Sequence, residues 1–528
     1  MIFLRGPRGL VLIVVILLFS TVYYYQRLSA PVRTTKHEEE AVGAHDGKIE
    51  YVQPAEEITT SSVEKAVKST TIEVVVETKS ASTPIYKPIS DNDAEHGIEA
   101  AVPTVPHAVS REDILLIVKT GTSTIWRRMP MQLSTTLADI PNYELYSDLR
   151  ETLTHGVEAI DVLSNISEII RDHDKAAYSI YEDLQTDIHA YREQAQLPGD
   201  EPEMPPGNHK GWILDRYKFL PMLTHAQEHY PNFKWYIYIE DDTFVFWDNL
   251  LQWLATLPTD DKPAYYGAYS GEINATFAQG GSGIAFSRSL MRSVFGGPNA
   301  PTLLEYANFT ADSCCGDMIL GKVLRDHGVL VNEGEYGPVS FRPEPPWKTS
   351  FEEFLWCMPI FTFHHLHQRD LVQLMMLERK HRQSVLGSRP ILFNDIFHAT
   401  VTPHLLARRD DWDNFASRYI LTNNVTTLLS TPRWPTPPTV RNATALEQAY
   451  TSPEACHAAC VEVETCRMWR HEVDNEQNKS CALDTVVILG RAIEGRKYWD
   501  KREISSGWMV ERIKSTLLVD QCETVVSP

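Results

Sequence analysis

The fold is decided by the stretch KWYIYIEDDTFV, residues 234–245, in which an apolar run ends in three consecutive carboxylates. Its aromatic and β-branched residues predict a buried strand. Open α/β sheets bind ligands at the carboxyl ends of their strands. Glu240, Asp241 and Asp242 repel one another there, so their packing requires a cation, and oxygen ligands favour Mg²⁺ or Mn²⁺. The alternative is an acidic loop that merely closes the strand.

Two earlier stretches predict neighbouring strands of the same sheet. Residues 113–120, DILLIVKT, form an apolar run that is typical of a buried, parallel strand. Residues 142–148, NYELYSD, predict a second strand that ends at Asp148. A polar helical region at 160–196 and a further helix at about 212–230 follow. Strands that alternate with helices predict an α/β fold.

Three later motifs bring further polar groups to the ends of predicted elements. Residues 279–288, QGGSGIAFSR, hold a glycine cluster that allows close approach to a ligand, or simply forms a structural turn. Residues 314–321, CCGDMILG, put Asp317 at the start of an apolar helix, where helix capping is the alternative role. Residues 360–367, IFTFHHLH, end an apolar strand in three histidines, which indicates an imidazole ligand or a proton carrier.

The composition excludes several classes of protein. The chain has 528 residues, with 49 Lys and Arg against 70 Asp and Glu, which gives a formal charge of −21. This balance argues against a general nucleic-acid binder, which needs a basic surface. At 43% hydrophobic residues the chain can bury a sizeable core, so wholesale disorder is excluded. Only one long apolar run exists, which excludes a membrane protein with several spans.

Taken in order, these motifs resemble those of the fringe and core-1 β-1,3-galactosyltransferase superfamily. The similarity covers residues 112–380 and rests on VKT at 118–120, WYIYIEDDTFV at 235–245, GGSG at 280–283, GDMILG at 316–321 and FHH at 363–365. The resemblance implies a GT-A catalytic domain, which is Rossmann-like with a mixed, mostly parallel sheet. It also implies an inverting transfer from a UDP-sugar with Mn²⁺ as cofactor.

The resemblance assigns roles to individual residues. Asp242 sits at the last position of the family's DxD motif and is the expected direct Mn²⁺ ligand, with Glu240 at the first position. His364 is the expected second protein ligand, and His365 is the runner-up. Asp317 sits where the family has its catalytic base. The residues expected to bind the UDP-sugar are Thr120, Arg128, Asp148, Lys218 and Asp241.

Two positions depart from the family's pattern. The family has a second acid before the base, where this chain has Gly316, and the first DxD position is Glu240 rather than Asp. Neither departure removes a required metal ligand, so we expect activity, with altered acceptor binding near Gly316. Asp317 would take the proton of the acceptor hydroxyl while its oxygen attacks the anomeric carbon, which inverts the configuration without a covalent intermediate.

The N-terminus predicts a membrane anchor. Residues 9–25, GLVLIVVILLFSTVYYY, are just long enough to span a bilayer and end in an aromatic belt. A cleaved signal peptide is the rival interpretation. The predicted organisation is a cytoplasmic tail and signal-anchor helix at 1–27, a disordered stem at 28–110, the glycosyltransferase domain at 111–432, and a linker with a small module at 433–528. We therefore expect a single-pass type II protein of the Golgi or another secretory-pathway membrane, with the catalytic domain in the lumen.

The small module is defined by its cysteines. Cys456, Cys460, Cys466 and Cys481 resemble the pattern of a PAN/apple module, a disulfide-stapled α+β fold. The resemblance implies the pairs Cys456–Cys481 and Cys460–Cys466, and a protein or carbohydrate ligand. A zinc site is the rival interpretation, but the spacing lacks CxxC pairs and the compartment favours disulfides.

The remaining cysteines are harder to pair. Cys314 and Cys315 precede the predicted base, and we expect one of them to bridge to Cys357. Cys522 has no obvious partner. The charged, aromatic segment RRDDWDN at 408–414 has no role in the predicted chemistry.

The sequence thus predicts an enzyme. It would transfer a hexose or N-acetylhexosamine from a UDP-sugar to a hydroxyl of a glycan or glycoprotein, in a β-1,3-type linkage. The alternative is a catalytically inactive, membrane-anchored lectin-like or adhesion protein that works through the PAN/apple-like module.

Overall fold

The computed structural model describes residues 109–196, 210–260, 262–272, 274–332, 337–384, 386–387, 389–426, 428, 438–493, 501–517 and 522. These residues all belong to one compact unit, 96–528. The predicted anchor and most of the predicted stem lie outside the described residues.

The main sheet has seven strands in the order β3-β4-β2-β1-β5-β10-β7. It is mostly parallel at its centre, because β1 pairs in parallel with both β2 and β5, and β2 pairs in parallel with β4. The outer strands β3, β10 and β7 join it antiparallel. The strands are β1 (Ile114–Lys119), β2 (Tyr143–Ser147), β3 (Glu151–Thr152), β4 (Glu158–Asp161), β5 (Trp235–Glu240), β7 (Tyr265–Gly267) and β10 (Ile284–Ser287).

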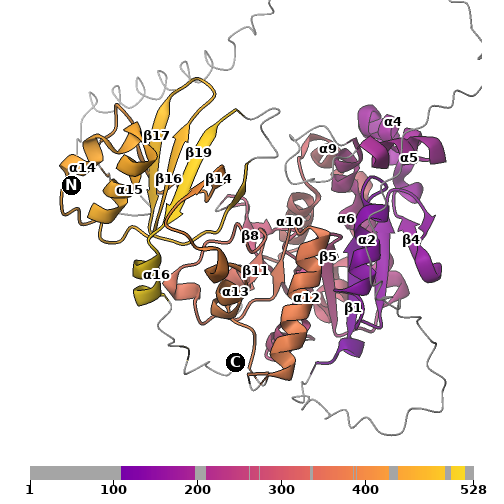
Figure 1. Cartoon of the computed structure of the whole chain (residues 1–528). Helices are drawn as coiled ribbons and strands as arrows, with labels where there is room; N and C mark the ends of the chain where they lie inside the picture. The colour runs from indigo at the N-terminus through magenta and orange to yellow at the C-terminus, as the bar shows by residue number, and fades with distance from the viewer. Residues whose placement is uncertain are drawn as a thin grey trace, which may run out of the picture. The chain divides into compact units, whose positions relative to one another are not determined.

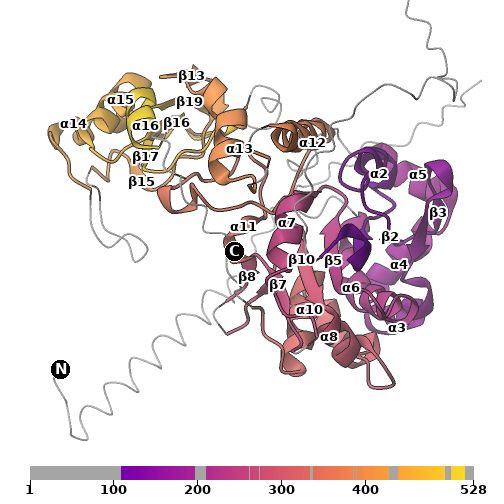
Figure 2. The same cartoon turned by 90° about the horizontal axis from the view of Figure 1, so that it is seen from below.

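Both faces of the sheet are covered by helices (Figures 1 and 2). Successive side chains of a strand point to opposite faces, so Tyr236 and Tyr238 of β5 pack with α6 (Lys210–His229) and α10 (Gly316–Asp326). The alternate residues of β5 pack on the other face with α2 (Ile125–Ser134) and α7 (Trp247–Leu254). Burial on both faces explains why these strands read as continuous apolar runs.

Further helices surround this core. The polar region expected at 160–196 contains three separate α-helices, and Asp174 caps the second of them by accepting the Ala177 N–H at 3.0 Å. The remaining helices of this part are α3 (Ser167–His173), α4 (Lys175–Leu184), α5 (Asp187–Gln196), α8 (Arg288–Leu290), α9 (Leu303–Asp312), α11 (Gly337–Ser340), α12 (Gln368–Gln383) and α13 (Phe393–Thr400).

A small second sheet builds the edge where the acids lie. Its order is β11 (Phe341–Arg342), β12 (Thr362–Phe363) and β6 (Phe244–Val245). β12 runs antiparallel to β6, with Phe363 opposite Phe244. The residues that follow β12 are therefore brought back beside the residues that precede β6.

A five-stranded antiparallel sheet forms the C-terminal part, with β16 at its centre (Figure 1). Two of its strands come from before residue 432, where we expected the boundary between the catalytic domain and the linker. In order the strands are β13 (Arg409–Asp410), β19 (Glu503–Trp508), β16 (Met468–Val473), β17 (Lys479–Asp484) and β15 (Tyr419–Leu421). The helices α14 (Thr444–Glu447), α15 (Pro453–Glu462) and α16 (Val510–Thr516) and the short pair β14 (Trp412–Asp413) and β18 (Arg491–Ala492) accompany it.

One apolar core joins the C-terminal sheet to the preceding residues. Phe351 and Phe397 belong to the same buried cluster as Met468, Val487 and Trp508. A bridge between Phe351 and Val487 adds backbone hydrogen bonds in both directions. The C-terminal sheet is therefore packed against the chain before it.

Four disulfides pair all eight cysteines. Cys456–Cys481 and Cys460–Cys466 confirm the pairs that the PAN/apple resemblance implied. The expected bridge from Cys314 or Cys315 to Cys357 is wrong, because Cys314 pairs with Cys315 and Cys357 pairs with Cys522. The reason is spatial, since Cys357 packs in the apolar core that includes Cys522, while the adjacent cysteines precede α10 on the main sheet.

The predicted fold class needs a correction. The structure is mixed α/β with a mostly parallel main sheet and four disulfides. The prediction also included an N-terminal transmembrane helix. In the part of the chain that the structure describes, no helix has both the length and the apolar character to cross a bilayer. Residues 9–25, to which that helix was assigned, lie outside this part.

Candidate functional site

The three carboxylates lie at the carboxyl end of β5, as the strand pattern predicted. β1 and β5 are in register with Lys119 opposite Glu240, so the residues after both strands meet at one edge. Asp241 and Asp242 follow in the turn to β6, and both are buried, each 3% exposed. Buried charges are costly unless they are paired, so their partners define what this edge can do.

Asp242 meets two histidines. Oδ1 of Asp242 lies 3.0 Å from Nε2 of His364, and Oδ2 lies 3.7 Å from Nδ1 of His365. The ligand atoms of the three residues all lie within 4.8 Å of one another. His365 has a φ of 57°, in the left-handed region, and the two imidazole rings stack with centroids 3.8 Å apart. Such backbone conformations are uncommon outside glycine and cluster at functional sites.

This group fits a divalent metal ion. Oδ1 of Asp242 and both ring nitrogens of His364 are buried and form no hydrogen bond of normal geometry with the described residues. Buried polar atoms are rarely left so, unless a ligand or ion completes them. One carboxylate with two imidazoles is a donor set that suits Mn²⁺ as well as other first-row ions. Asp242, His364 and His365 could therefore hold the ion between them.

The electrostatics of the group point the same way. Burial alone would lower the pKa of His364, but the charges of Asp242 and Glu240 outweigh burial and raise it to about 10. Burial likewise opposes ionisation of Asp242, yet Arg128 and His364 hold its pKa well below the usual range. The carboxylates therefore draw a positive charge to this position, which a metal ion can supply in place of the imidazole proton.

Gly281 makes room for His364. A Cβ built on Gly281 would lie 1.9 Å from Cε1 of the His364 ring, so no other residue fits here without displacing the imidazole. The Gly281 carbonyl also accepts the Thr243 hydroxyl at 2.7 Å, which ties the glycine cluster to the acid-bearing turn. The glycine cluster therefore supports the histidine directly and is more than a turn.

Asp241 is satisfied by protein groups instead. Its carboxylate accepts the hydroxyl of Thr120 at 2.7 Å and that of Thr124 at 2.6 Å, and pairs with Arg128 at 2.5 Å. A second guanidinium nitrogen of Arg128 lies 3.2 Å from Asp242. Thr120 and Arg128, both expected to bind the donor, are thus fixed around Asp241, beside the candidate metal site of Asp242, His364 and His365.

Lys218 and Asp148 form a buried pair behind this edge. Both side chains are 0% exposed, and Nζ of Lys218 lies 2.9 Å from Oδ2 of Asp148. Lys218 also donates to the Thr120 carbonyl at 2.8 Å, and Asp148 accepts the N–H and hydroxyl of Thr122. The pair therefore holds the loop after β1 in place and does not face solvent, in contrast to the direct donor contact that we expected of both residues.

The charged groups of this edge form one continuous chain in which acids and bases alternate. Lys119 links two of its parts, because its ammonium lies 3.1 Å from Asp215 and 3.1 Å from Glu240. Although burial opposes ionisation, Lys119 and His364 keep the pKa of Glu240 below its usual range. We call this set the charge chain, and it runs through Asp148, Lys218, Asp215, Lys119, Glu240, His364, Asp242, Arg128 and Asp241.

Asp317 lies on the other side of the glycine cluster. It is the second residue of α10, whose N-cap is Cys315, so it is not the capping residue. Oδ2 of Asp317 accepts the Gly280 N–H at 2.8 Å. A Cβ on Gly280 would lie 3.4 Å from both the Asp317 Cβ and Oε1 of Glu240. Burial, together with the charge of Glu240, raises the pKa of Asp317.

The glycine before Asp317 has a packing reason. A Cβ on Gly316 would lie 2.3 Å from the ring of Phe219, which is itself buried against Tyr238 with ring centroids 4.9 Å apart. Phe219 thus fills the space that an acidic side chain at position 316 would require. The departure from the family's pattern at Gly316 is coupled to this aromatic residue.

Sequence reasoning missed several residues of the site. Thr124 contacts Asp241, and Gln132 donates to the carbonyls of Asp241 and Thr243 at 3.0 and 2.9 Å. Together with Arg128 they are spaced four residues apart along α2, so they share one face of that helix. The recurrence of a polar residue at every fourth position, from 124 to 132, was the sequence signal that could have identified them.

The comparisons with known proteins add no relative. No protein-family model matches this chain, and no curated protein matches it. The resemblance to the fringe and core-1 galactosyltransferases therefore rests on the sequence motifs alone.

Proposed function

We propose that this protein is a metal-dependent, inverting glycosyltransferase. It transfers a hexose or N-acetylhexosamine from a UDP-sugar to a hydroxyl of a glycan or glycoprotein, in a β-1,3-type linkage. The single observation that carries the proposal is the convergence of Asp242, His364 and His365, whose possible ligand atoms all lie within 4.8 Å of one another. Asp317 supports it, because this acid accepts the Gly280 N–H while the next glycine, Gly281, lies against the His364 ring.

The residues on the base side act on the acceptor. The raised pKa of Asp317 makes its carboxylate a stronger proton acceptor than an exposed aspartate. The Gly280 N–H fixes one of its oxygens at 2.8 Å, which leaves the carboxylate in one orientation. It takes the proton of the acceptor hydroxyl while that oxygen bonds to the anomeric carbon and the bond to the diphosphate breaks. One displacement inverts the configuration.

The residues on the metal side act on the donor. When bound, the ion supplies Lewis-acid stabilisation of the diphosphate as it leaves. Arg128 adds a guanidinium beside Asp242, and the hydroxyls of Thr120 and Thr124 fix Asp241 in turn. The charge chain holds these groups in place before the donor binds, so little reorganisation is needed in the transition state.

We also propose that the protein works in the secretory pathway. Four disulfides support this, because such bonds form and persist in oxidising compartments.

The test is a donor screen with the purified full chain. We expect UDP release from one or a few UDP-sugars that requires Mn²⁺ and stops when EDTA is added. The acceptor screen follows with that donor, and NMR of the product reports the anomeric configuration. If no UDP-sugar turns over and UDP does not bind with Mn²⁺, the enzyme proposal fails and the lectin-like alternative takes its place.

A further inference from the structure

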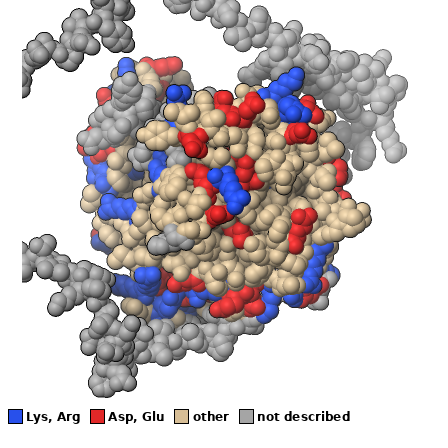
Figure 3. Space-filling model, turned by 90° about the vertical axis from the view of Figure 1, so that its right-hand side faces the viewer, with Lys and Arg blue, Asp and Glu red and all other residues tan. Residues whose placement is uncertain are grey.

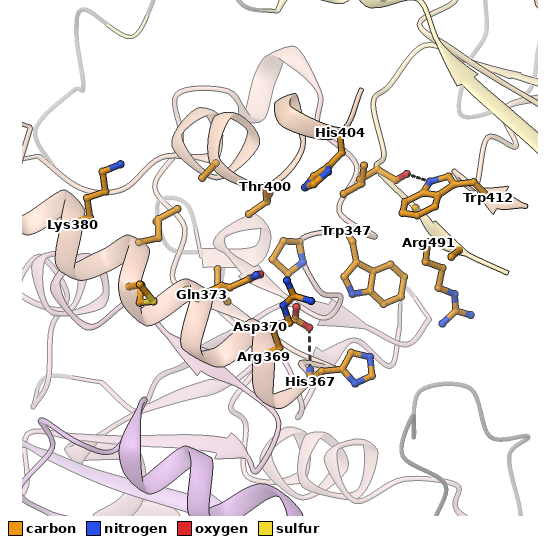
Figure 4. A pocket seen from close by; sticks show the side chains of 18 residues that line it. Trp347, His367, Arg369, Asp370, Gln373, Lys380, Thr400, His404, Trp412 and Arg491 are labelled. Carbon is orange, nitrogen blue, oxygen red and sulfur yellow. Dashed lines mark hydrogen bonds between the residues drawn. The ribbon is translucent and has the colours of Figure 1, made fainter. Parts of the chain in front are cut away.

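A cavity of about 900 Å³ lies between α12 and the β14–β18 pair (Figure 4). Its lining includes residues of α12 and residues from the C-terminal part of the chain. None of these residues belongs to the proposed donor site. The charged and aromatic residues in its lining are Trp347, His367, Arg369, Asp370, Lys380, His404, Trp412 and Arg491.

One wall is a single face of α12. Arg369, Gln373 and Lys380 recur at intervals of four and seven residues, so they lie along the same side of the helix. Arg369 and Lys380 are exposed, and neither is paired with a carboxylate among the residues that the structure describes. Eleven residues of helix separate them by about 16 Å, which suits an oligomeric ligand better than a single small ion.

The opposite wall carries aromatic rings and a third cation. Trp347 and Trp412 line the cavity, and the guanidinium of Arg491 lies 5.2 Å from the centroid of the Trp347 ring. Figure 4 shows these three side chains close together at one end of the cavity, with Lys380 at the other. Both indoles are half-buried, so their positions are set by packing while part of each remains accessible.

This wall is fixed by close backbone packing. The Gly490 N–H donates to the Trp347 carbonyl at 2.7 Å, and the Trp412 indole N–H donates to the Leu489 carbonyl at 2.7 Å. A Cβ on Gly490 would lie 1.9 Å from the Asp413 carbonyl oxygen. The cavity is therefore built by the fold, and its aromatic groups are held in place before any ligand arrives.

The charge of the cavity is opposite to that of the chain. Among the described residues that line the cavity, three are permanent cations and one is a carboxylate, Asp370, which accepts the His367 N–H at 3.1 Å and so caps α12. The chain as a whole carries −21. On the face drawn in Figure 3, Lys and Arg side chains are interspersed with Asp and Glu. The cavity thus favours an anionic ligand.

We propose that this cavity binds an acidic oligosaccharide. Its sugar rings would pack their apolar faces on the indoles of Trp347 and Trp412, and its carboxylate or sulfate groups would pair with Arg369 and Lys380. The indole rings beside the cations favour a saccharide over an acidic peptide. This binding goes beyond the proposed transferase reaction and does not depend on it.

The experiment is isothermal titration calorimetry on the full chain with three probes of six residues each. Hyaluronan hexasaccharide is acidic, N-acetylchitohexaose is its neutral counterpart, and hexaglutamate is an acidic peptide. We expect the hyaluronan fragment to bind most tightly and to weaken as salt rises. The double variant Arg369→Gln, Lys380→Gln should lose about tenfold in affinity, while the exposed control Lys175→Gln should not change it.

Each other outcome overturns the proposal. If hyaluronan hexasaccharide does not bind, the proposal is wrong. If the neutral hexasaccharide binds equally tightly, the cations do not contribute to the affinity. If hexaglutamate binds more tightly, the ligand of the cavity is an acidic peptide. An unchanged affinity of the double variant moves the binding elsewhere. Because Arg369 and Lys380 are exposed, the variant should fold, and an unfolding temperature equal to that of the wild type, measured by circular dichroism, checks that it does.

Discussion

The edge of the main sheet and the cavity along α12 both gather charged side chains, but they use them in opposite ways. At the sheet edge nearly every charge is buried and neutralised by a neighbour in the charge chain. In the cavity Arg369 and Lys380 remain exposed, and basic groups outnumber acidic ones. The sheet edge therefore offsets the cost of burying charge by pairing acids with bases. The cavity avoids that cost by leaving its cations exposed to water.

The difference lies in which groups are left for a ligand. Removing ions from water costs several kcal/mol each, so a buried charge must be paired within the protein. The charge chain pairs its members with one another, yet Oδ1 of Asp242 and both ring nitrogens of His364 are among the buried atoms of the described residues that form no hydrogen bond of normal geometry. A small, highly charged ion fits that space. The exposed cations of the cavity keep their hydration and suit a larger, more diffuse anion.

The largest effect should come from removing the incomplete acid. Asp242→Asn keeps the size of the side chain but removes the charge that a metal ion requires. We expect the Mn²⁺-dependent transfer rate to fall by about a thousandfold, because a Lewis acid supplies several kcal/mol in the transition state. Initial rates at saturating donor measure this. A variant that keeps wild-type activity and Mn²⁺ affinity would show that the ion binds elsewhere.

The next prediction tests Asp317, on one side of the glycine cluster, independently of the candidate metal site on the other side. Asp317→Asn should lower the transfer rate by about a hundredfold or more, because it removes the proton acceptor. Mn²⁺-dependent UDP binding, measured by calorimetry, should stay the same. In the wild type the rate should fall as the pH drops through the raised pKa of Asp317, since the protonated acid cannot act as a base. Full transfer by the variant would exclude the assignment.

A single methyl group should disturb the metal-binding group without removing a ligand. Gly281→Ala places a Cβ where the His364 ring lies, so we expect Mn²⁺ affinity to fall by about tenfold to a hundredfold. Gly337→Ala is the matched control, because among the described residues its Cβ would meet the Trp253 ring alone, at an ordinary 3.4 Å. Titration of both variants with Mn²⁺ measures the two affinities. Equal affinities would mean that His364 is not a ligand.

The smallest effect concerns a buried acid outside both regions. Glu378, on the buried side of α12, has its pKa raised to about 7 by burial and by the charge of Asp248. The folded protein therefore keeps this proton while the unfolded chain loses it, so stability falls as the pH rises from about 4.5 to about 7. Glu378→Gln should remove this loss, about 2–3 kcal/mol at pH 8 and little at pH 4.5.

Urea unfolding at the two pH values measures this difference, and the exposed Glu228→Gln is the control. A wild type and a Gln variant with parallel pH dependence would mean that Glu378 is ionised in the folded state. Arg382, whose guanidinium lies 4.0 Å from the Glu378 carboxylate, would then be sufficient to keep this buried acid charged.

Much of the sheet and of the site could be predicted from the sequence, because period and strand ends are local signals. The apolar runs at 114–119 and 235–240 became β1 and β5, and the acids after β5 meet the histidines after β12. The partners of the acids were harder to predict. Lys119 and Asp215 lie 96 residues apart, and no period in the sequence connects them.

The same reason explains the misplaced cysteine bridge. Cys357 and Cys522 are 165 residues apart and meet only because the apolar core around Phe351 forms between them. The strands β13 and β15 likewise join the C-terminal sheet through pairing with β19 and β17, which their own short sequences do not predict. Contacts of this kind depend on tertiary packing and not on local propensity.

The Cys357–Cys522 bridge also makes most of the C-terminal third of the chain a covalent ring. A single proteolytic cut anywhere between these two cysteines would leave both products joined, and they would separate on a gel only after reduction. Closing a loop of this length also lowers the entropy of the unfolded chain, by an amount worth about 5 kcal/mol. A chain nicked within this ring therefore still keeps its C-terminal sheet attached to the proposed catalytic part.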